Sequence, residues 1–150
     1  METITNKNTS VLLQLSALTQ YIFPLGNFIF PTLIWSIKKN DSKFVDENGK
    51  QAINFQLSLF LYSLIMGIIA VPIFLYTLFS DVSIQMVNDN DWVIDQLSTG
   101  KITGLVIIGA VAAFIFFLLK IAEFFLIIYA AVKNSNGEHY KFPLTINFLK

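Results

Sequence analysis

The sequence contains no cysteine and no arginine, and charged residues make up only 13% of its 150 residues. A chain without cysteine cannot build a disulfide framework or a thiolate-bound metal site. Ten lysines are balanced by ten acidic residues, so the formal net charge is zero. A nucleic-acid-binding protein needs a clustered surplus of positive charge, which is missing here. These shortages exclude several classes of protein and predict no nucleic-acid partner.

Apolar residues are abundant instead, at 55% of the chain, and the mean hydropathy is +0.64. A soluble domain usually carries about 25% charged residues, roughly twice the share found here. Charge is absent from positions 8–37 and 51–80, and positions 102–132 contain only Lys120 and Glu123. Such long uncharged runs are typical of a protein that is embedded in a lipid bilayer.

The three runs are long enough to cross a membrane, because a helix needs about 20 apolar residues to span a hydrocarbon core of roughly 30 Å. Backbone groups in lipid have no water to bond, so such a segment has to be helical. The sequence therefore predicts an all-α integral membrane protein, a single membrane domain over 1–150 with three transmembrane helices. We expect the spans at about 11–37, 52–79 and 102–132.

The first span contains helix-breaking residues. Proline interrupts the hydrogen-bond ladder of a helix, so we expect a kink at Pro24 and Gly26. A short interfacial helix before a steeper span is the alternative. The segment has no basic region in front of it and is longer than the apolar part of a signal peptide, so we expect it to be retained.

The lysines predict the orientation of the chain. The first loop, 38–51, and the tail, 133–150, carry seven of them. The second loop, 80–101, carries four aspartates and one lysine. By the positive-inside rule the first loop and the tail face the cytoplasm, whereas the N-terminus and the acidic loop face outside. The sequence thus predicts an N-out/C-in, multi-pass protein of the inner (cytoplasmic) membrane. Mixed signs make the first loop a poor site for anionic lipid, since three acidic residues offset four lysines.

Lys120 and Glu123 are the most conspicuous candidate functional residues. They lie three residues apart, on one face of the third span. An ionisable group at that depth costs at least a few kcal/mol unless it is paired or hydrated. The pair fits an ion pair that neutralises itself, a contact with a partner helix, or an ion or proton relay.

The second span begins with a row of polar residues. Gln51, Asn54 and Ser58 share one helical face, and Tyr62 continues it, while Gln56 points elsewhere and needs its own partner. One interpretation is a seam that binds a partner or a hydrophilic segment. The other is polar contact among the protein's own helices, at about 0.6–2 kcal/mol for each interhelical hydrogen bond.

Catalytic and metal-binding patterns are missing. Asp46 and Glu47 are neighbours and point apart on a helix, and His139 is the only histidine. We find no phosphate-binding glycine loop, no nucleophile elbow and no zinc motif. The sequence predicts a non-enzymatic protein without a cofactor or metal site. Gly49 suggests close packing in the second helix, and Gly137 is a natural C-cap of the third.

Two blocks of sequence resemble a known family. The first block runs over 31–58 and includes Phe44, Asp46, Glu47, Gly49 and Lys50. The second block runs over 130–146 and includes Asn136, Gly137, Tyr140 and Pro143. Both resemble a small bacterial membrane protein family of unknown function that is related to the small channel-like subunit of the chloroplast Tic translocon. The magnetosome proteins MamF and MmsF are similar to the same pattern.

The resemblance implies an all-helical membrane protein without enzymatic activity that associates with other integral membrane proteins, as a hetero-complex or a homo-oligomer. Our first hypothesis is an accessory or structural subunit of a larger membrane complex, linked to protein translocation or envelope assembly. The alternative is a self-assembling channel or carrier for ions or small solutes. In that case, Lys120, Glu123 and the polar face of the second span would line a pore between protomers.

Overall fold

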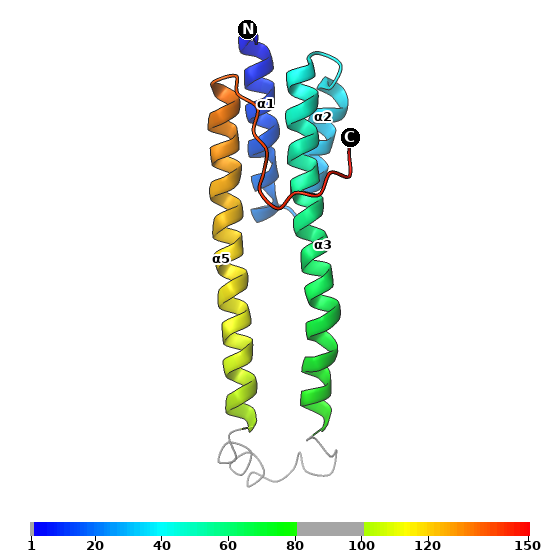
Figure 1. Ribbon diagram of the computed structural model, residues 1–150, viewed down its shortest axis with the longest axis vertical. Helices are drawn as coiled ribbons and strands as arrows, with labels where there is room; N and C mark the ends of the chain where they lie inside the picture. The colour runs from blue at the N-terminus through cyan, green and yellow to red at the C-terminus, as the bar shows by residue number, and fades with distance from the viewer. Residues whose placement is uncertain (1, 81–100) are drawn as a thin grey trace. The chain divides into compact units, whose positions relative to one another are not determined.

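A computed structural model describes residues 2–80 and 101–150 of the chain, and these residues form helices and an extended C-terminal tail (Figure 1). The elements follow in the order α1, the 3-10 helix η1, α2, α3 and α5. No strand occurs in the described part of the chain, so the predicted all-α class is confirmed. The predicted acidic loop lies, except for its first and last residue, outside the described residues.

The first predicted span is not one helix. It is divided between α1 (Ile4–Ser16) and α2 (Gly26–Lys38), with η1 (Ala17–Tyr21) after α1. Figure 1 shows α1 and α2 side by side and running in opposite directions. Each has 13 residues, about 20 Å at 1.5 Å per residue, which is shorter than a bilayer core. The prediction of a single kinked helix over 11–37 is therefore wrong.

The residues between η1 and α2 explain the reversal. Pro24 has no N–H to continue a helical ladder. Leu25 adopts a left-handed backbone with φ of 63°, which ends the turn and starts α2 in a new direction. A side chain at Gly26 would collide with the backbone of Thr19. Proline and glycine at this point make a helical hairpin rather than a kink.

The two remaining predicted spans are long helices, α3 (Lys43–Ser80) and α5 (Lys101–Ser135). Within them, Lys43–Pro72 and Gly109–Ser135 are long and apolar enough to cross a membrane. The start of α3 corrects the predicted loop 38–51, of which only a few residues are non-helical. The Ser42 hydroxyl accepts a hydrogen bond from the backbone N–H of Phe44 at 3.0 Å and so helps to begin the helix.

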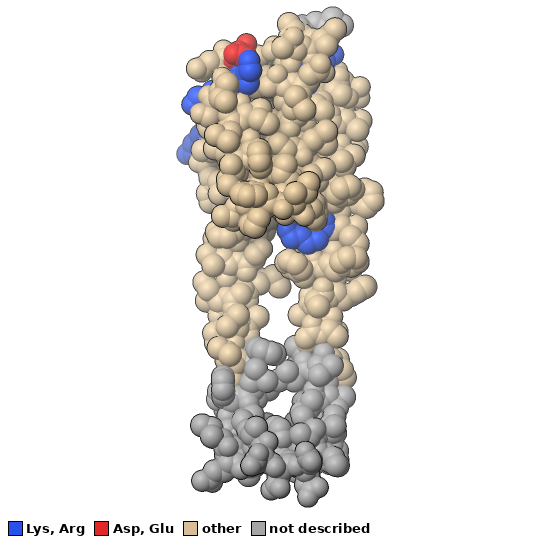
Figure 2. Space-filling view, turned by 180° about the vertical axis from the view of Figure 1, so that it is seen from behind, with Lys and Arg blue, Asp and Glu red and all other residues tan. Residues whose placement is uncertain are grey.

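Two compact units are present, and the candidate site lies in the first, which comprises Met1–Tyr62 and Ile121–Lys150. Its apolar core contains Ala17 from η1, Phe55 from α3, Ile127 and Ala130 from α5, and Phe142 from the tail. The second unit, Ser63–Lys120, contains the apolar parts of α3 and α5. Charged side chains are sparse on the described surface drawn in Figure 2.

The N-terminus lies beside the first turn between α2 and α3. The Ser42 hydroxyl donates a hydrogen bond to the Glu2 carboxylate at 3.2 Å. Lys7 lies against Gly137, where the tail leaves α5. The N-terminus, the first turn and the start of the tail therefore share one end of this unit. The hairpin of α1 and α2 returns the chain to its starting end, so the structure does not support the predicted placement of the N-terminus opposite the first loop.

Candidate functional site

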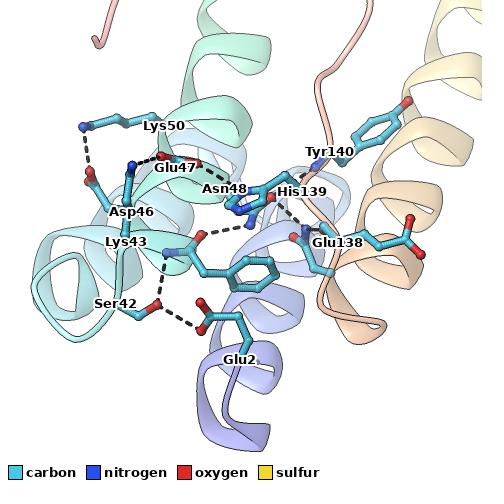
Figure 3. Close-up of polar contacts among 12 residues, drawn as sticks. Glu2, Ser42, Lys43, Asp46, Glu47, Asn48, Lys50, Glu138, His139 and Tyr140 are labelled. Carbon is cyan, nitrogen blue, oxygen red and sulfur yellow. Dashed lines mark hydrogen bonds and ion pairs between the residues drawn. The ribbon is translucent and has the colours of Figure 1, made fainter.

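The two blocks of the family pattern meet at the start of α3 (Figure 3). The imidazole of His139, in the tail, lies edge-on to the Phe44 ring with centroids 4.9 Å apart. Its Nδ1 is 3.3 Å from the Glu47 carboxylate. Phe44 is buried, whereas His139 and Glu47 are about half exposed. The tail is thus attached to the first turns of α3 by one aromatic contact and one polar contact.

A buried amide network joins α1, α3 and α5 behind this contact. Asn134 Nδ2 donates to Asn48 Oδ1 at 2.8 Å, and Gln14 Nε2 donates to Asn134 Oδ1 at 3.1 Å. Gln14 Nε2 also lies 3.3 Å from the backbone oxygen of Asn48. The backbone N–H of Tyr140 donates to Asn48 Oδ1 at 3.3 Å. All three amide side chains are at most 1% exposed, and they satisfy one another as buried polar groups require.

The phenol of Tyr140 lies at the edge of this network. Its ring is 5.3 Å from that of Tyr129 on α5. Burial, together with the neighbouring Tyr129, raises the pKa of Tyr140 above its ordinary value.

The acidic residues at the start of α3 are engaged in local contacts. Asp46 accepts a hydrogen bond from the indole N–H of Trp35 at 2.9 Å and pairs with Lys50 at 2.6 Å. Glu47 pairs with Lys43 at 3.5 Å in addition to His139. The arrangement holds α2 against α3 and leaves neither carboxylate without a cation.

Gly49 allows α1 and α2 to pack closely on α3. A side chain at this position would collide with the indole of Trp35 and come within 3.0 Å of Leu13. The close packing that its place in the sequence suggested is confirmed, because only a residue without a Cβ leaves room for the indole.

The tail, residues 136–150, begins at a helix C-cap. Gly137 has φ of 81°, and its N–H donates to the backbone oxygen of Asn134 at 2.9 Å. The predicted role of Gly137 as the cap of this helix is confirmed. Asn136 is exposed in the same turn, and Glu138 pairs with Lys133 at 2.5 Å.

Further along, the tail packs on the core and then turns. Phe142 stacks on Phe55 with ring centroids 4.2 Å apart and planes 10° from parallel. Pro143 is exposed and precedes Leu144, which has φ of 57°. Residues 136–143 form the first arm of the tail. The second arm, residues 144–150, returns along α3.

The predicted polar face of α3 binds the backbone of this second arm. Asn54 accepts from the N–H of Leu149 at 2.8 Å and donates to its carbonyl oxygen at 3.0 Å. Ser58 Oγ accepts from the N–H of Ile146 at 2.8 Å, and the Tyr62 hydroxyl donates to the Leu144 oxygen at 2.8 Å. We call Asn54, Ser58 and Tyr62 the polar seam. It supplies the hydrogen bonds that a non-helical backbone needs beside α3, which is apolar and long enough to cross a membrane.

The two glutamines near the start of α3, Gln51 and Gln56, do not belong to the polar seam. Gln56 is 1% exposed and accepts a hydrogen bond from Asn27 of α2 at 2.7 Å, which is the separate partner that its position required. Gln51, in contrast, makes no side-chain hydrogen bond to any residue that the structure describes, so it is not part of the polar seam. It lies in the wall of a cleft of about 510 Å³ between the start of α3 and both arms of the tail.

Lys120 and Glu123 belong to different units, since the second unit ends at Lys120 and the first resumes at Ile121. Glu123 is 3% exposed and accepts a hydrogen bond from Gln20 of η1 at 2.8 Å. The Lys120 ammonium lies 5.8 Å from the centre of the Phe116 ring, within reach of a cation–π attraction. The Glu123 carboxylate thus holds η1 against α5.

The buried amide network is the part of the site that sequence patterns did not single out. Gln14 and Asn134 are polar residues in or beside long apolar runs, and that rarity is the signal that could have found them. Their meeting depends on the hairpin that places α1 between α3 and α5, which a pattern of spans does not encode. Within residues 2–80 and 101–150, no three His, Asp or Glu side chains come together as a metal site would require.

Comparison with known protein families gives a match that covers nearly the whole chain. The family model described as the magnetosome magnetite crystal formation protein family, MamF/MmsF, matches residues 5–149. The comparison with curated proteins and the comparison with solved structures each find no match. Since the matched region covers nearly the whole chain, including both blocks and the polar seam, the protein belongs to the MamF/MmsF magnetosome family.

Proposed function

We propose that this protein is a non-catalytic, multi-pass membrane protein that acts as a structural subunit of a larger membrane assembly. The observation that carries the proposal is the surface of the long helices in the second unit. Six consecutive residues of α5, from Phe114 to Leu119, are each between 46% and 62% exposed. Six residues cover more than one full turn, so the helix presents large apolar side chains on every side. Such a surface needs lipid or other membrane helices around it.

Two glycines support contact with other helices. A Cβ added at Gly67 on α3 or at Gly109 on α5 would meet nothing within 4 Å. Small residues on the surface of membrane helices let a neighbouring helix approach closely. These open positions are therefore candidate points of contact with a second protein or a second copy.

The proposed orientation places the first turn, the tail and the N-terminus together in the cytoplasm, since the lysines of this end favour the inner side. Two helices would cross the inner membrane, and the hairpin of α1 and α2 would enter it only in part. This replaces the three-span topology expected from hydropathy.

The family name supplies a context for the assembly, because it refers to magnetite crystal formation in magnetosomes. We propose a structural contribution to such a membrane rather than a catalytic one. A link to protein translocation or envelope assembly is supported only by the resemblance to the Tic subunit. The channel or carrier alternative has less support, because the Glu123 carboxylate is buried and engaged by Gln20.

The test is purification of the full chain in a mild detergent, with mass measurement and identification of co-purifying proteins. We expect a mass above that of one chain, or defined membrane partners. Gly109→Leu should reduce the assembly because it blocks close approach, and Val111→Leu, an exposed neighbour on the same helix, should not. A chain that always elutes alone and as a monomer would contradict the proposal.

A further inference from the structure

The cleft of about 510 Å³ beside the start of α3 is rich in lysine. Lys43 and Lys50 contribute from the first two turns of α3, and Lys141 and Lys150 contribute from the two arms of the tail. The sequence separates these pairs by more than 90 positions. They meet only because the tail docks on the polar seam. The mixed signs of the first loop argued against binding of anionic lipid. The tail adds two lysines, Lys141 and Lys150, to the same cleft.

The carboxylates in the cleft do not cancel this charge, because they already have partners. Asp46 is held by Lys50 and by the indole of Trp35, and Glu47 is held by Lys43 and His139. Counting side chains, four lysines face two carboxylates. The two lysine side chains that remain without a paired carboxylate side chain are those of the tail.

Lys141 and Lys150 form no ion pair with any residue that the structure describes. The side-chain amides of Gln51 and Asn147, which also line the cleft, make no hydrogen bond within the same described residues. Two ammonium groups and two amides therefore border one hollow, with donors available from both walls. Charge-assisted hydrogen bonds of this kind favour an anion with several oxygens, such as a phosphate.

The second arm of the tail indicates where that phosphate comes from. Successive side chains of an extended backbone point to opposite sides. Asn147 and Leu149 line the cleft, whereas Ile146 and Phe148 are 39% and 46% exposed. The cleft therefore lies directly beside exposed apolar side chains of the second arm. A headgroup in the cleft would leave acyl chains against apolar surface.

We propose that this cleft binds the phosphate headgroup of an anionic phospholipid. Basic pockets at the cytoplasmic side of membrane helices recognise such headgroups by charge and hydrogen bonding. This lipid-binding proposal rests on the proposed membrane location of the protein, but not on its proposed role in a larger assembly. A monomeric protein could still bind the lipid, so the two proposals fail in different experiments.

The test uses the purified full chain in detergent, with thermal unfolding followed while phosphatidylglycerol or phosphatidylcholine is added. We expect saturable stabilisation by phosphatidylglycerol only. The double variant Lys141→Gln with Lys150→Gln should weaken the apparent affinity at least about tenfold. The matched control is Lys38→Gln with Lys39→Gln, which removes the same charge at the same end of the unit but outside the cleft, and it should bind like the unaltered chain.

Three results would overturn the proposal. The two lipids could stabilise equally, or both double variants could lose affinity equally, as expected for unspecific attraction. Inorganic phosphate could displace the lipid fully at millimolar concentration, which would identify a free anion as the ligand. If the cleft variant does not fold, Gln51→Leu removes a donor from the opposite wall, and unchanged affinity of that variant would count against the cleft in the same way.

Discussion

The side-chain amide of Asn134, in the last turn of α5, donates a hydrogen bond to the side-chain oxygen of Asn48 on α3 at 2.8 Å. Gln14 of α1 bonds to both residues, so three helices share one buried amide cluster. Neither asparagine is more than 1% exposed. Because a buried amide that loses its partner leaves an unsatisfied group, this cluster fixes one arrangement of the three helices.

Replacing Asn134 by alanine should destabilise the first unit by about 1–3 kcal/mol, because Gln14 and Asn48 each lose a hydrogen-bond partner in a dry site. The measurement is the free energy of unfolding in detergent micelles. Ser135→Ala is the matched control, since its exposed hydroxyl bonds only to the backbone of its own helix. Equal stability of the two variants would show that the cluster does not hold the helices together.

Replacing Gly49 by alanine should cost about 1–3 kcal/mol through overpacking, because the new methyl group collides with the Trp35 indole. The indole cannot move freely, since its N–H is bonded to Asp46. Gly67→Ala makes the same change on the same helix, but its methyl group meets no atom of this chain within 4 Å, so the stability of the single chain in detergent should be unchanged or slightly higher. Thermal unfolding of both variants in one detergent separates packing from helix propensity. A Gly49 variant as stable as the Gly67 variant would refute the tight contact.

The sequence could predict the helical class and the two long helices, because a bilayer-length run without charge has few structural alternatives. It could also predict that Asn54, Ser58 and Tyr62 share one face, since helical periodicity alone determines that. What they bind was not predictable. The ligand is the backbone of the tail, and backbone groups carry no sequence signature.

The hairpin of α1 and α2 was missed for a different physical reason. Hydropathy measures how apolar a segment is but not whether the chain reverses within it. The uncharged run 8–37 is long enough for one span and was therefore predicted as one. The left-handed conformation of Leu25 and the close approach of Gly26 to Thr19 reverse the chain. Pro24 and Gly26 were recognised as helix-breaking residues. The same residue types occur in a kinked helix and in a helical hairpin, so they do not distinguish the two.

Removing the amide of Asn54 should loosen the second arm of the tail. Asn54→Ala eliminates both hydrogen bonds to Leu149, so we expect faster amide exchange at Leu149 by about tenfold or more and a loss of about 1–2 kcal/mol. Hydrogen exchange followed by NMR or mass spectrometry measures the effect. Ser36→Ala, an exposed change on α2, should leave this exchange unaltered. Unchanged protection of Leu149 in the Asn54 variant would mean that the seam does not hold the arm.

The hairpin predicts that both ends of the chain face the same side of the membrane. Because the sequence has no cysteine, a single introduced cysteine reports its own side by reaction with a membrane-impermeant maleimide. Thr5→Cys, near the N-terminus, and Asn136→Cys, at the start of the tail, are both exposed and should react from the same side. Asp89→Cys, in the acidic loop, should react only from the other side, because in the proposed topology α3 and α5 each cross the membrane once. Unfolding in denaturant beforehand should give full labelling of all three and serves as the control for reactivity. If Thr5→Cys instead reacts together with Asp89→Cys, the first segment crosses the bilayer and the three-span topology holds.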